Sequence, residues 1–322
     1  RAEGAVALAQ ASNLSLLTRR ITVRKALIAA TLAVFVLSSA AVAHDPPGFL
    51  GGVFQWPESA LPVLDGDLAE WDVIPSDYWI TEQDLVQSSE RVDVYTGPLD
   101  VSSIAVRMIT TWNEETNRAY WAMERFDDMS MGGSSDDLEG VLDADHSGGN
   151  FWNLEGQTDE EIARTRGRHA QTHHWYFDAG FSEKWTWFWM TQADWYDDPE
   201  YTDLGHTVVG EVGSNTELTQ FAEWYQVYWD DFNWTDPAGS IIHDFEVDEI
   251  VGLAYHLYDG DGRDGSEDCN CWSRWALSPN VQSFGDADFL ADFVLLDVDD
   301  SIDFVTAVED DSWGRIKASL AR

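Results

Sequence analysis

The sequence predicts an all-β protein built around an antiparallel β-sandwich with jelly-roll or immunoglobulin-like layers, long loops and one short helix in an insertion. Short runs of β-branched and aromatic residues recur between Gly, Asp and Asn residues, and amphipathic helical patterns are scarce. These runs lie at 104–109, 119–124, 185–190 and 250–257, and a last one lies at 289–296. Strands at this spacing, with so little helix between them, favour a sandwich.

The composition indicates a folded domain. The chain has 322 residues and 17 tryptophans, which is far too aromatic for a disordered protein despite its charge. No Pro/Ser-rich linker interrupts its central part. We therefore divide it into a signal peptide with an upstream extension (1–43), an extended lead-in (44–60), one sandwich (61–300) and a C-terminal tail (301–322).

The N-terminal segment has the pattern of a secretory signal peptide. A basic stretch at 19–25 precedes an apolar run at 26–40, and the small residues Ala41 and Ala43 predict cleavage before His44. An uncleaved anchor is the alternative, because the run approaches the roughly 18 residues that span a bilayer. With cleavage, we expect a secreted, periplasmic or cell-surface protein that does not insert into the membrane.

The charge excludes some partners. The formal net charge is −41, and the expected signal peptide carries more basic than acidic residues, so the remainder is more acidic still. Such a surface repels nucleic-acid phosphates and anionic membranes. It fits a protein adapted to salty water or one that binds cations such as calcium, and the two alternatives remain open.

Two smaller features lie in the loops. Thr158 is placed to cap a short helix over 159–164, with acidic residues in its first turn. Cys269 and Cys271 are separated by one residue, so either a strained disulfide or two packed thiols is possible. The cysteine pattern excludes covalent haem, because no C-x-x-C-H motif is present.

Several motifs resemble the family 9 carbohydrate-binding module. Asp65 and Gly66 open a turn that leads to Trp71, and the segment 111–128 has the order of a hairpin that ends in two adjacent aspartates. The resemblance covers most of 61–300 and implies a calcium-associated sandwich that binds sugars on aromatic side chains without cleaving them. The opening motif also fits haem-binding relatives of this sandwich class, including the domain resembling the ethylbenzene dehydrogenase haem subunit.

Two loops have the composition of a calcium site, with acidic oxygens on alternate residues and glycines that allow tight turns. Neither completes an EF-hand, and Asp/Gly turns also arise in ordinary hairpins. For the first loop, the resemblance makes a structural role for the aspartates an equal alternative. The candidate ligands are Asp143, Asp145 and Ser147 in the first loop and Asp259, Asp261 and Asp264 in the second.

The aromatic residues divide into core and candidate binding residues. Trp185, Trp187 and Trp189 alternate along one strand, and we expect at least two of them in the core. Loop tryptophans beside Asp, Asn or Glu are better candidates, because a sugar site combines a ring face with acceptors for hydroxyl groups. These candidates are Trp175, Trp195, Trp224, Trp229 and Trp234.

The sequence favours a binding protein over an enzyme. It contains no G-x-S-x-G elbow, phosphate loop or dinucleotide fingerprint. His169 and His173 would share the face of a helix, where they offer metal or axial haem ligands. We expect a secreted, non-catalytic, calcium-stabilised protein that binds an oligosaccharide or polysaccharide. The alternatives are a haem-binding electron-transfer sandwich and a structural surface protein.

Overall fold

A computed structural model describes β-strands of this chain and some of the connections between them. Residues 44–322 form one compact unit. The described residues are 45–87, 99–130, 136–151, 156–158, 161, 165, 167–176, 187–188, 198–211, 215–233, 237–260, 273–280, 283, 285–302 and 304. Cys269 and Cys271 lie outside them. Among these residues, no helix has the length and apolarity needed to cross a membrane.

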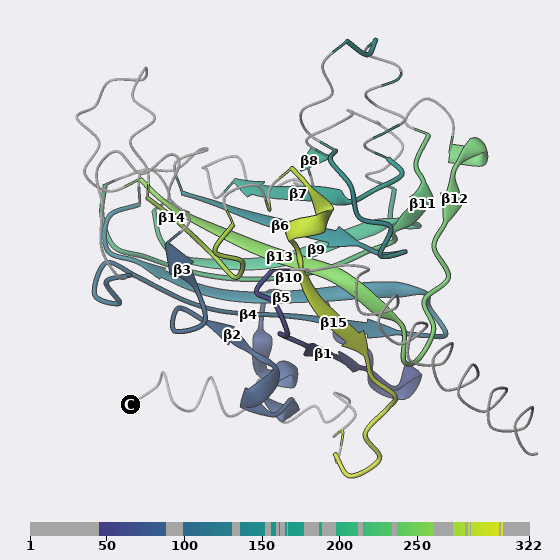
Figure 1. The fold of residues 1–322 in the computed structure, drawn as a ribbon. Coiled ribbons are helices and arrows are strands. Elements are labelled where there is room, and N and C mark those ends of the chain that lie inside the picture. Colours follow the sequence, from purple (N-terminus) through teal and green to yellow (C-terminus); the bar gives the residue numbers. More distant parts are fainter. Residues whose placement is uncertain are drawn as a thin grey trace, which may run out of the picture. The chain divides into compact units, whose positions relative to one another are not determined.

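The strands form two curved layers that are joined at one side (Figure 1). One layer, here the β13 layer, has the order β8-β7-β6-β13-β15, with β14 and β3 attached beside β13. The other, here the β5 layer, has the order β4-β5-β10-β9, with β2 attached to β4. The bounds of these strands are β2 Ile80–Thr81, β3 Val86–Gln87, β4 Ile104–Asn113, β5 Arg118–Asp127, β6 Asp137–Asp143, β7 Gln171–Tyr176, β8 Trp187–Phe188, β9 Thr202–Gly210, β10 Leu218–Gln226, β13 Ile250–Asp259, β14 Ser273–Ala276 and β15 Ala291–Leu295.

Strand β1 (Gly51–Gln55) joins the two layers, and here the structure departs from a purely antiparallel sandwich. It pairs in parallel with β15 through Gly51 and Phe293, and in parallel with β4 through Phe54 and Thr111. The predicted all-β class is confirmed, but the sheet is mixed. The segment predicted as an extended lead-in thus contributes a central strand.

The longest pairings join β4, β5, β10 and β9, two of them as hairpins (β4–β5 and β9–β10). β4 and β5 pair from Ile104–Asp127 to Asn113–Arg118 around a turn in which Asn117 has a φ of 51°. β10 pairs with β5 on one side and with β9 on the other. The strands predicted at 104–109, 119–124, 250–257 and 289–296 lie within β4, β5, β13 and around β15.

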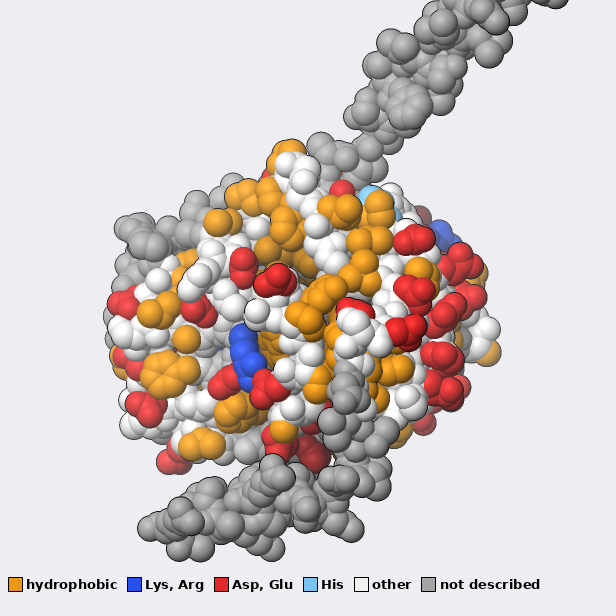
Figure 2. Space-filling view, turned by 90° about the horizontal axis from the view of Figure 1, so that it is seen from below, with side chains coloured by type: hydrophobic (Ala, Val, Ile, Leu, Met, Phe, Trp, Pro, Cys, Tyr) orange, Lys and Arg blue, Asp and Glu red, His pale blue; other side chains and the backbone are white. Residues whose placement is uncertain are grey.

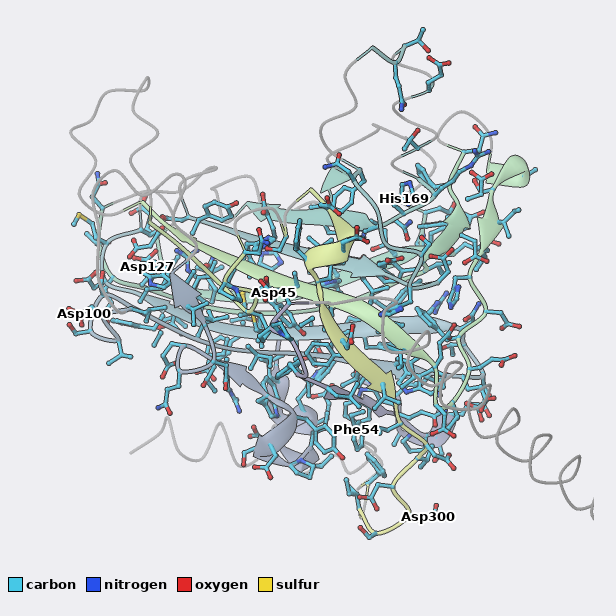
Figure 3. The ribbon with its side chains drawn as sticks, viewed as in Figure 1. Asp45, Phe54, Asp100, Asp127, His169 and Asp300 are labelled. Carbon is cyan, nitrogen blue, oxygen red and sulfur yellow. The ribbon has the colours of Figure 1, made fainter. Side chains whose placement is uncertain are left out.

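The hydrophobic residues form three clusters, because both faces of each layer are covered. The largest lies between the layers and includes Trp121, Trp224 and Tyr255. A second covers the outer face of the β5 layer, where Phe54 packs with Trp56 and Trp71; Figure 3 shows Phe54 on that lower side. The third lies over the outer face of the β13 layer and includes Val141, Phe151, Ala170, Trp229, Phe232, Ala254, Ala287 and Leu290.

Short 3₁₀ helices and one capped helix start occupy the connections. The outer face of the β5 layer is covered by η1 (Glu58–Ala60), η2 (Leu68–Val73) and η3 (Ser76–Tyr78). In the insertion, Glu161 and Thr165 are helical. Thr158 Oγ1 accepts from the Glu161 backbone N–H at 3.3 Å, and the Glu161 carboxylate accepts from the Thr158 N–H at 2.8 Å. This reciprocal capping confirms the predicted cap at Thr158.

Candidate functional site

The tryptophans whose side chains the structure describes all lie in the core. Each of these eight rings is at most 7% exposed. The prediction of loop positions with accessible rings is therefore wrong for two of the five candidates, Trp224 and Trp229. The eight residues are Trp56, Trp71, Trp79, Trp112, Trp121, Trp224, Trp229 and Trp275.

Trp224 and Trp229 are packed against other rings. Trp224 lies on β10 and stacks on Trp121 of β5, with ring centroids 5.9 Å apart and an interplanar angle of 11°. Trp229 begins β11 (Trp229–Asp231) and contacts Phe232 and Tyr201 with centroid distances of 5.0 and 6.0 Å. Neighbouring acids and amides misled the sequence prediction, because they also flank aromatic residues within a buried strand, as at Trp224, or at its start, as at Trp229.

Of the three remaining candidates, the structure describes the backbone of Trp175 alone. Trp175 is on β7, not in a loop as predicted. β7 pairs with the terminal strand β8 through His173–Phe188 and His174–Trp187. Trp195 and Trp234 lie outside the described residues. Trp234 belongs by sequence to the connection between β11 and β12 (Ile241–Ile242), which form a separate two-stranded hairpin.

The first predicted calcium loop is organised by Asp143 at the end of β6. This side chain is fully buried and its two oxygens accept backbone N–H groups, from Gly148 at 2.8 Å and from Ser147 at 3.3 Å. Burial, helped by a hydrogen bond with the Asp145 carboxyl, raises the pKa of Asp143 to about 8, although the Gly148 and Ser147 N–H groups oppose this rise. The Asp145 carboxylate also accepts the Ser147 N–H, at 3.1 Å, so three candidate ligands lie together.

In the second predicted loop the structure describes Asp259, which is 5% exposed at the end of β13. Asp261 and Asp264 lie outside the described residues. Within the described part of the chain, no group of three or more His, Cys, Asp and Glu side chains has an arrangement that could hold a metal ion. Calcium at either loop stays a prediction.

A buried ion network that the sequence did not predict lies between the layers. Arg125 is fully buried, and its guanidinium contacts Asp127 at 2.7 Å and Asp136 at 3.7 Å. Burial raises the pKa of Asp127 to about 6, although the Arg125 charge opposes this rise. Figure 3 shows Asp127 and His169 toward opposite ends of the unit, so this network and the insertion near β7 are separate regions.

The turn that carries the family resemblance has a structural role. The Glu223 carboxylate on β10 accepts the backbone N–H groups of Asp65 and Gly66 and the indole N–H of Trp71, each at 2.8 Å. Burial raises the pKa of Glu223 to about 8, and the three donors oppose this rise. The motif therefore anchors the turn to the sheet, and Glu223, 157 residues beyond Gly66 in the sequence, completes it.

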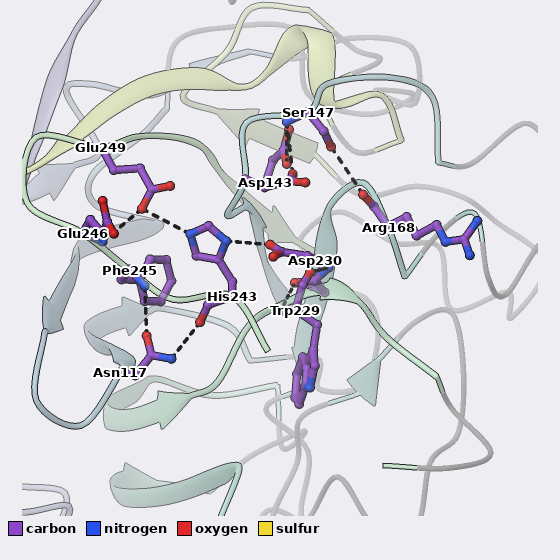
Figure 4. Close-up of polar contacts among 12 residues, drawn as sticks. Asn117, Asp143, Ser147, Arg168, Trp229, Asp230, His243, Phe245, Glu246 and Glu249 are labelled. Atoms are coloured by element: carbon purple, nitrogen blue, oxygen red, sulfur yellow. Dashed lines mark hydrogen bonds and ion pairs between the residues drawn. The ribbon is translucent and has the colours of Figure 1, made fainter. Parts of the chain in front are cut away.

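A second acid-bound side chain, His243, follows the β11–β12 hairpin (Figure 4). Its Nδ1 lies 2.6 Å from Asp230 Oδ1 and its Nε2 lies 3.2 Å from Glu249 Oε2. Burial opposes the charged ring, but the hydrogen bonds and charges of Glu249 and Asp230 outweigh burial and raise the pKa of His243 to about 9. The sequence analysis did not single out this histidine.

The two histidines predicted to share the face of a helix do not lie on one, and His169 is in a bend just before β7. His173 lies on strand β7, not on a helix, and is fully buried against Tyr228 with centroids 5.6 Å apart. His256 lies 2.8 Å from Ser283 Oγ and 3.0 Å from Glu139 Oε2. This order resembles a nucleophile, base and acid, but Ser283 and His256 are both fully buried, so a substrate cannot reach them.

Comparison with known proteins finds similarity in fold but not in sequence. No family model matches the chain, and no curated protein matches it. The fold is similar to a carbohydrate binding module family 9 structure from Caldicellulosiruptor kristjanssonii in complex with cellotriose, with a TM-score of 0.46, 9% identity and coverage of 78% of this chain and 95% of that one. It is also similar to such a module from the same organism in complex with glucose, with a TM-score of 0.42, 10% identity and coverage of 78% and 97%.

Proposed function

We propose that this protein binds carbohydrate without cleaving it, outside the cytoplasm, by stacking sugar rings on tryptophan side chains. The candidate rings are Trp175, Trp195 and Trp234. The signal-peptide pattern at 19–43 supports export. Oligosaccharides offer both an apolar ring face and hydroxyl groups, which suits an aromatic surface surrounded by acids and amides.

Two strands of the chain's most aromatic region carry this proposal. β8 is the last strand in the order of the β13 layer, and it pairs with β7. Trp175 belongs to β7 and Trp187 to β8; in the sequence, Trp185 and Trp189 flank β8 and Trp195 follows. A sheet edge beside long connections is where a chain-like ligand reaches rings without opening the core.

The filled core supports the same assignment. Eight tryptophans already pack in the three clusters, and Trp121, Trp224 and Tyr255 occupy the space between the layers. Aromatic residues beyond those needed for packing are a feature of recognition surfaces. Several of the acidic groups described above, Asp143, Glu223 and Asp127 among them, bind backbone N–H groups or Arg125 and so have structural partners.

Tryptophan substitutions test the proposal. A glycan array identifies a ligand, and calorimetric titration of that glycan is then repeated with Trp175→Ala, Trp195→Ala and Trp234→Ala. We expect at least one of them to weaken affinity by about tenfold or more, because a hot-spot ring contributes on the order of 2 kcal/mol.

The matched control is Trp112→Phe. Trp112 is fully buried and donates its indole N–H to the Leu296 carbonyl at 3.0 Å, so this change should lower the melting temperature and leave affinity unchanged. The proposal is wrong if no glycan binds the native protein, or if all three alanine variants bind as the native protein does.

A further inference from the structure

We propose that protonated His243 is the positioning residue of the β11–β12 hairpin, so that loss of the proton loosens the hairpin. Trp234, a candidate sugar-binding residue, belongs by sequence to the connection of this hairpin, and we therefore expect loosening to weaken sugar binding as well. The link to sugar binding rests on the function proposed above. The link to the hairpin rests on the contacts of His243 alone.

His243 connects the base of the hairpin to the central sheet. Its backbone N–H donates to the Tyr228 carbonyl at 2.9 Å, which continues the pairing of β12 with β11. Its ring contacts Asp230 in β11 on one side and Glu249 on the other. Glu249 immediately precedes β13, and its carbonyl accepts the Leu295 N–H of β15 at 2.8 Å.

The backbone around His243 is fixed by Asn117 in the β4–β5 turn. Asn117 Nδ2 donates to the His243 carbonyl at 2.7 Å, and Asn117 Oδ1 accepts the Phe245 N–H at 3.0 Å (Figure 4). The Phe245 ring packs edge-on against the imidazole, with centroids 4.9 Å apart. The imidazole thus holds a fixed place between its two carboxylates, and its side chain is only 7% exposed.

The charge state of the ring decides whether both contacts persist. A charged imidazole donates from both nitrogens, whereas a neutral one has a single N–H and can satisfy only one carboxylate. The carboxyl groups that face this region are Asp230 from β11, and Glu249 and Glu246 from the loop before β13, where the Glu246 N–H also donates to Glu249. Without the proton, two carboxylates face a neutral ring and repel each other.

The opposite side of the hairpin is attached by groups that do not titrate in the same way. Gln171 of β7 bonds the backbone of Trp229 in both directions, at 3.0 and 3.2 Å, and the Phe232 N–H donates to the Gly167 carbonyl at 2.9 Å. The hairpin therefore stays attached on this side when His243 loses its proton. Loosening confined to the His243 side shifts the hairpin without unfolding it.

The test combines hydrogen exchange with sugar titration between pH 6 and pH 10.5. Backbone exchange in peptides covering 229–242 is corrected for the intrinsic pH dependence of exchange, and affinity is measured for the glycan found on the array. We expect protection of the hairpin to fall, and affinity to weaken by about fivefold or more, with a midpoint near pH 9. In His243→Gln, both should lose this pH dependence.

Two further variants keep the outcome clear. His206→Gln, on the partly exposed edge strand β9, should retain the native pH response. Asp230→Asn keeps an acceptor for His243 but removes a charge at a residue that is 40% exposed, so the midpoint should move down toward the ordinary pKa of histidine. Asp230→Asn provides the test if His243→Gln does not fold.

The outcomes separate the two proposals. A hairpin that loosens near pH 9 in a protein that binds no glycan overturns the proposed function and supports the role of His243. Glycan binding with no change in affinity, or a hairpin whose protection is the same at pH 7 and pH 10, overturns the positioning role.

Discussion

Glu223 and Asp143 are two buried carboxylates with the same task in different settings. Each accepts backbone N–H groups, and burial raises the pKa of each to about 8. Asp143 closes its own loop, four and five residues before the donors. Glu223 instead binds a turn 157 residues away and also accepts from Trp71.

The two carboxylates differ in how much of their interaction can be predicted from the local sequence. The Asp143 loop has all its partners within one short stretch, so its sequence resembles a calcium loop even though the carboxylate binds N–H groups. The turn at Asp65 and Gly66 needs Glu223 from another strand, so its sequence shows only half of the interaction. Backbone N–H donors around a buried carboxylate can hold a loop in place, as a bound cation does in a calcium loop.

The largest expected effect is the loss of stability on replacing a glycine in one of these two turns with alanine. Gly66 and Gly148 both donate to a buried carboxylate with φ values of 79° and 66°. A Cβ at Gly66 would lie 2.4 Å from the backbone carbon of His206, whereas one at Gly148 would meet the Asp288 side-chain oxygen, also at 2.4 Å. Because backbone cannot move aside, Gly66→Ala should cost about 3 kcal/mol or more of unfolding free energy.

Urea denaturation measures this difference, with Gly48→Ala as the control. Gly48 has a φ of 80° and no heavy atom within 4 Å of the added Cβ. Its substitution therefore costs only the strain of a left-handed backbone conformation, about 1 kcal/mol. Gly148→Ala should fall between the other two. Equal losses of unfolding free energy for Gly66→Ala and Gly48→Ala would contradict a close contact between the turn and the backbone of β9.

The next largest expected effect comes from changing the carboxylate that accepts the hydrogen bonds of the turn, Glu223. In Glu223→Gln the amide oxygen still accepts from Asp65 and Gly66, but the amide NH₂ faces the Trp71 indole N–H, which loses its acceptor. A buried unsatisfied donor costs about 1–3 kcal/mol. Chemical denaturation at neutral pH should show this loss, and a variant as stable as the native protein would contradict the role of Glu223.

The same variant has a signature in pH. The folded-state pKa of Glu223 is raised above its ordinary value of 4.5, so ionisation opposes folding. Glu223 should therefore make its full contribution to the unfolding free energy below pH 4.5, and this contribution should be lost as the pH rises toward 8. The stability difference between native protein and Glu223→Gln should change across this window and be constant above it.

A smaller effect tests the two roles of Asp143. Asp143→Asn retains one acceptor oxygen for Gly148 or Ser147 and should cost about 1 kcal/mol of unfolding free energy. Because both oxygens already accept N–H groups, we expect the same loss with calcium and with chelator. A loss seen only in calcium would instead identify Asp143 as a ligand, since a ligand that binds the folded state adds stability in proportion to its occupancy.

These residues show how far local sequence predicts this molecule. Alternating patterns located β4, β5, β13 and β15, and the cap at Thr158 was visible in a window of four residues. The parallel pairing of β1 and the hydrogen bonds of Glu223 to the turn at Asp65 and Gly66 depend on partners far away in the chain. Arg125 has its partners within eleven residues, but its burial between the layers does not show in the local sequence. Burial of Trp224 and Trp229 could not be predicted for the same reason, because neighbours along the chain do not show what packs above a ring.

The smallest expected effect comes from an acid that is not buried. Glu124 on β5 pairs with Arg107 at 2.6 Å, and both side chains are about one-third exposed. Figure 2 shows many Asp and Glu side chains on one face of the surface, and the chain carries a net charge of −41, so removing one negative charge also relieves repulsion. Glu124→Gln should therefore change the unfolding free energy by less than about 1 kcal/mol.

Denaturation at low salt and in 1 M NaCl checks this, because screening should remove the remaining difference at a Debye length of about 3 Å. A loss as large as that of Glu223→Gln, unaffected by salt, would mean that burial is not what distinguishes the two acids.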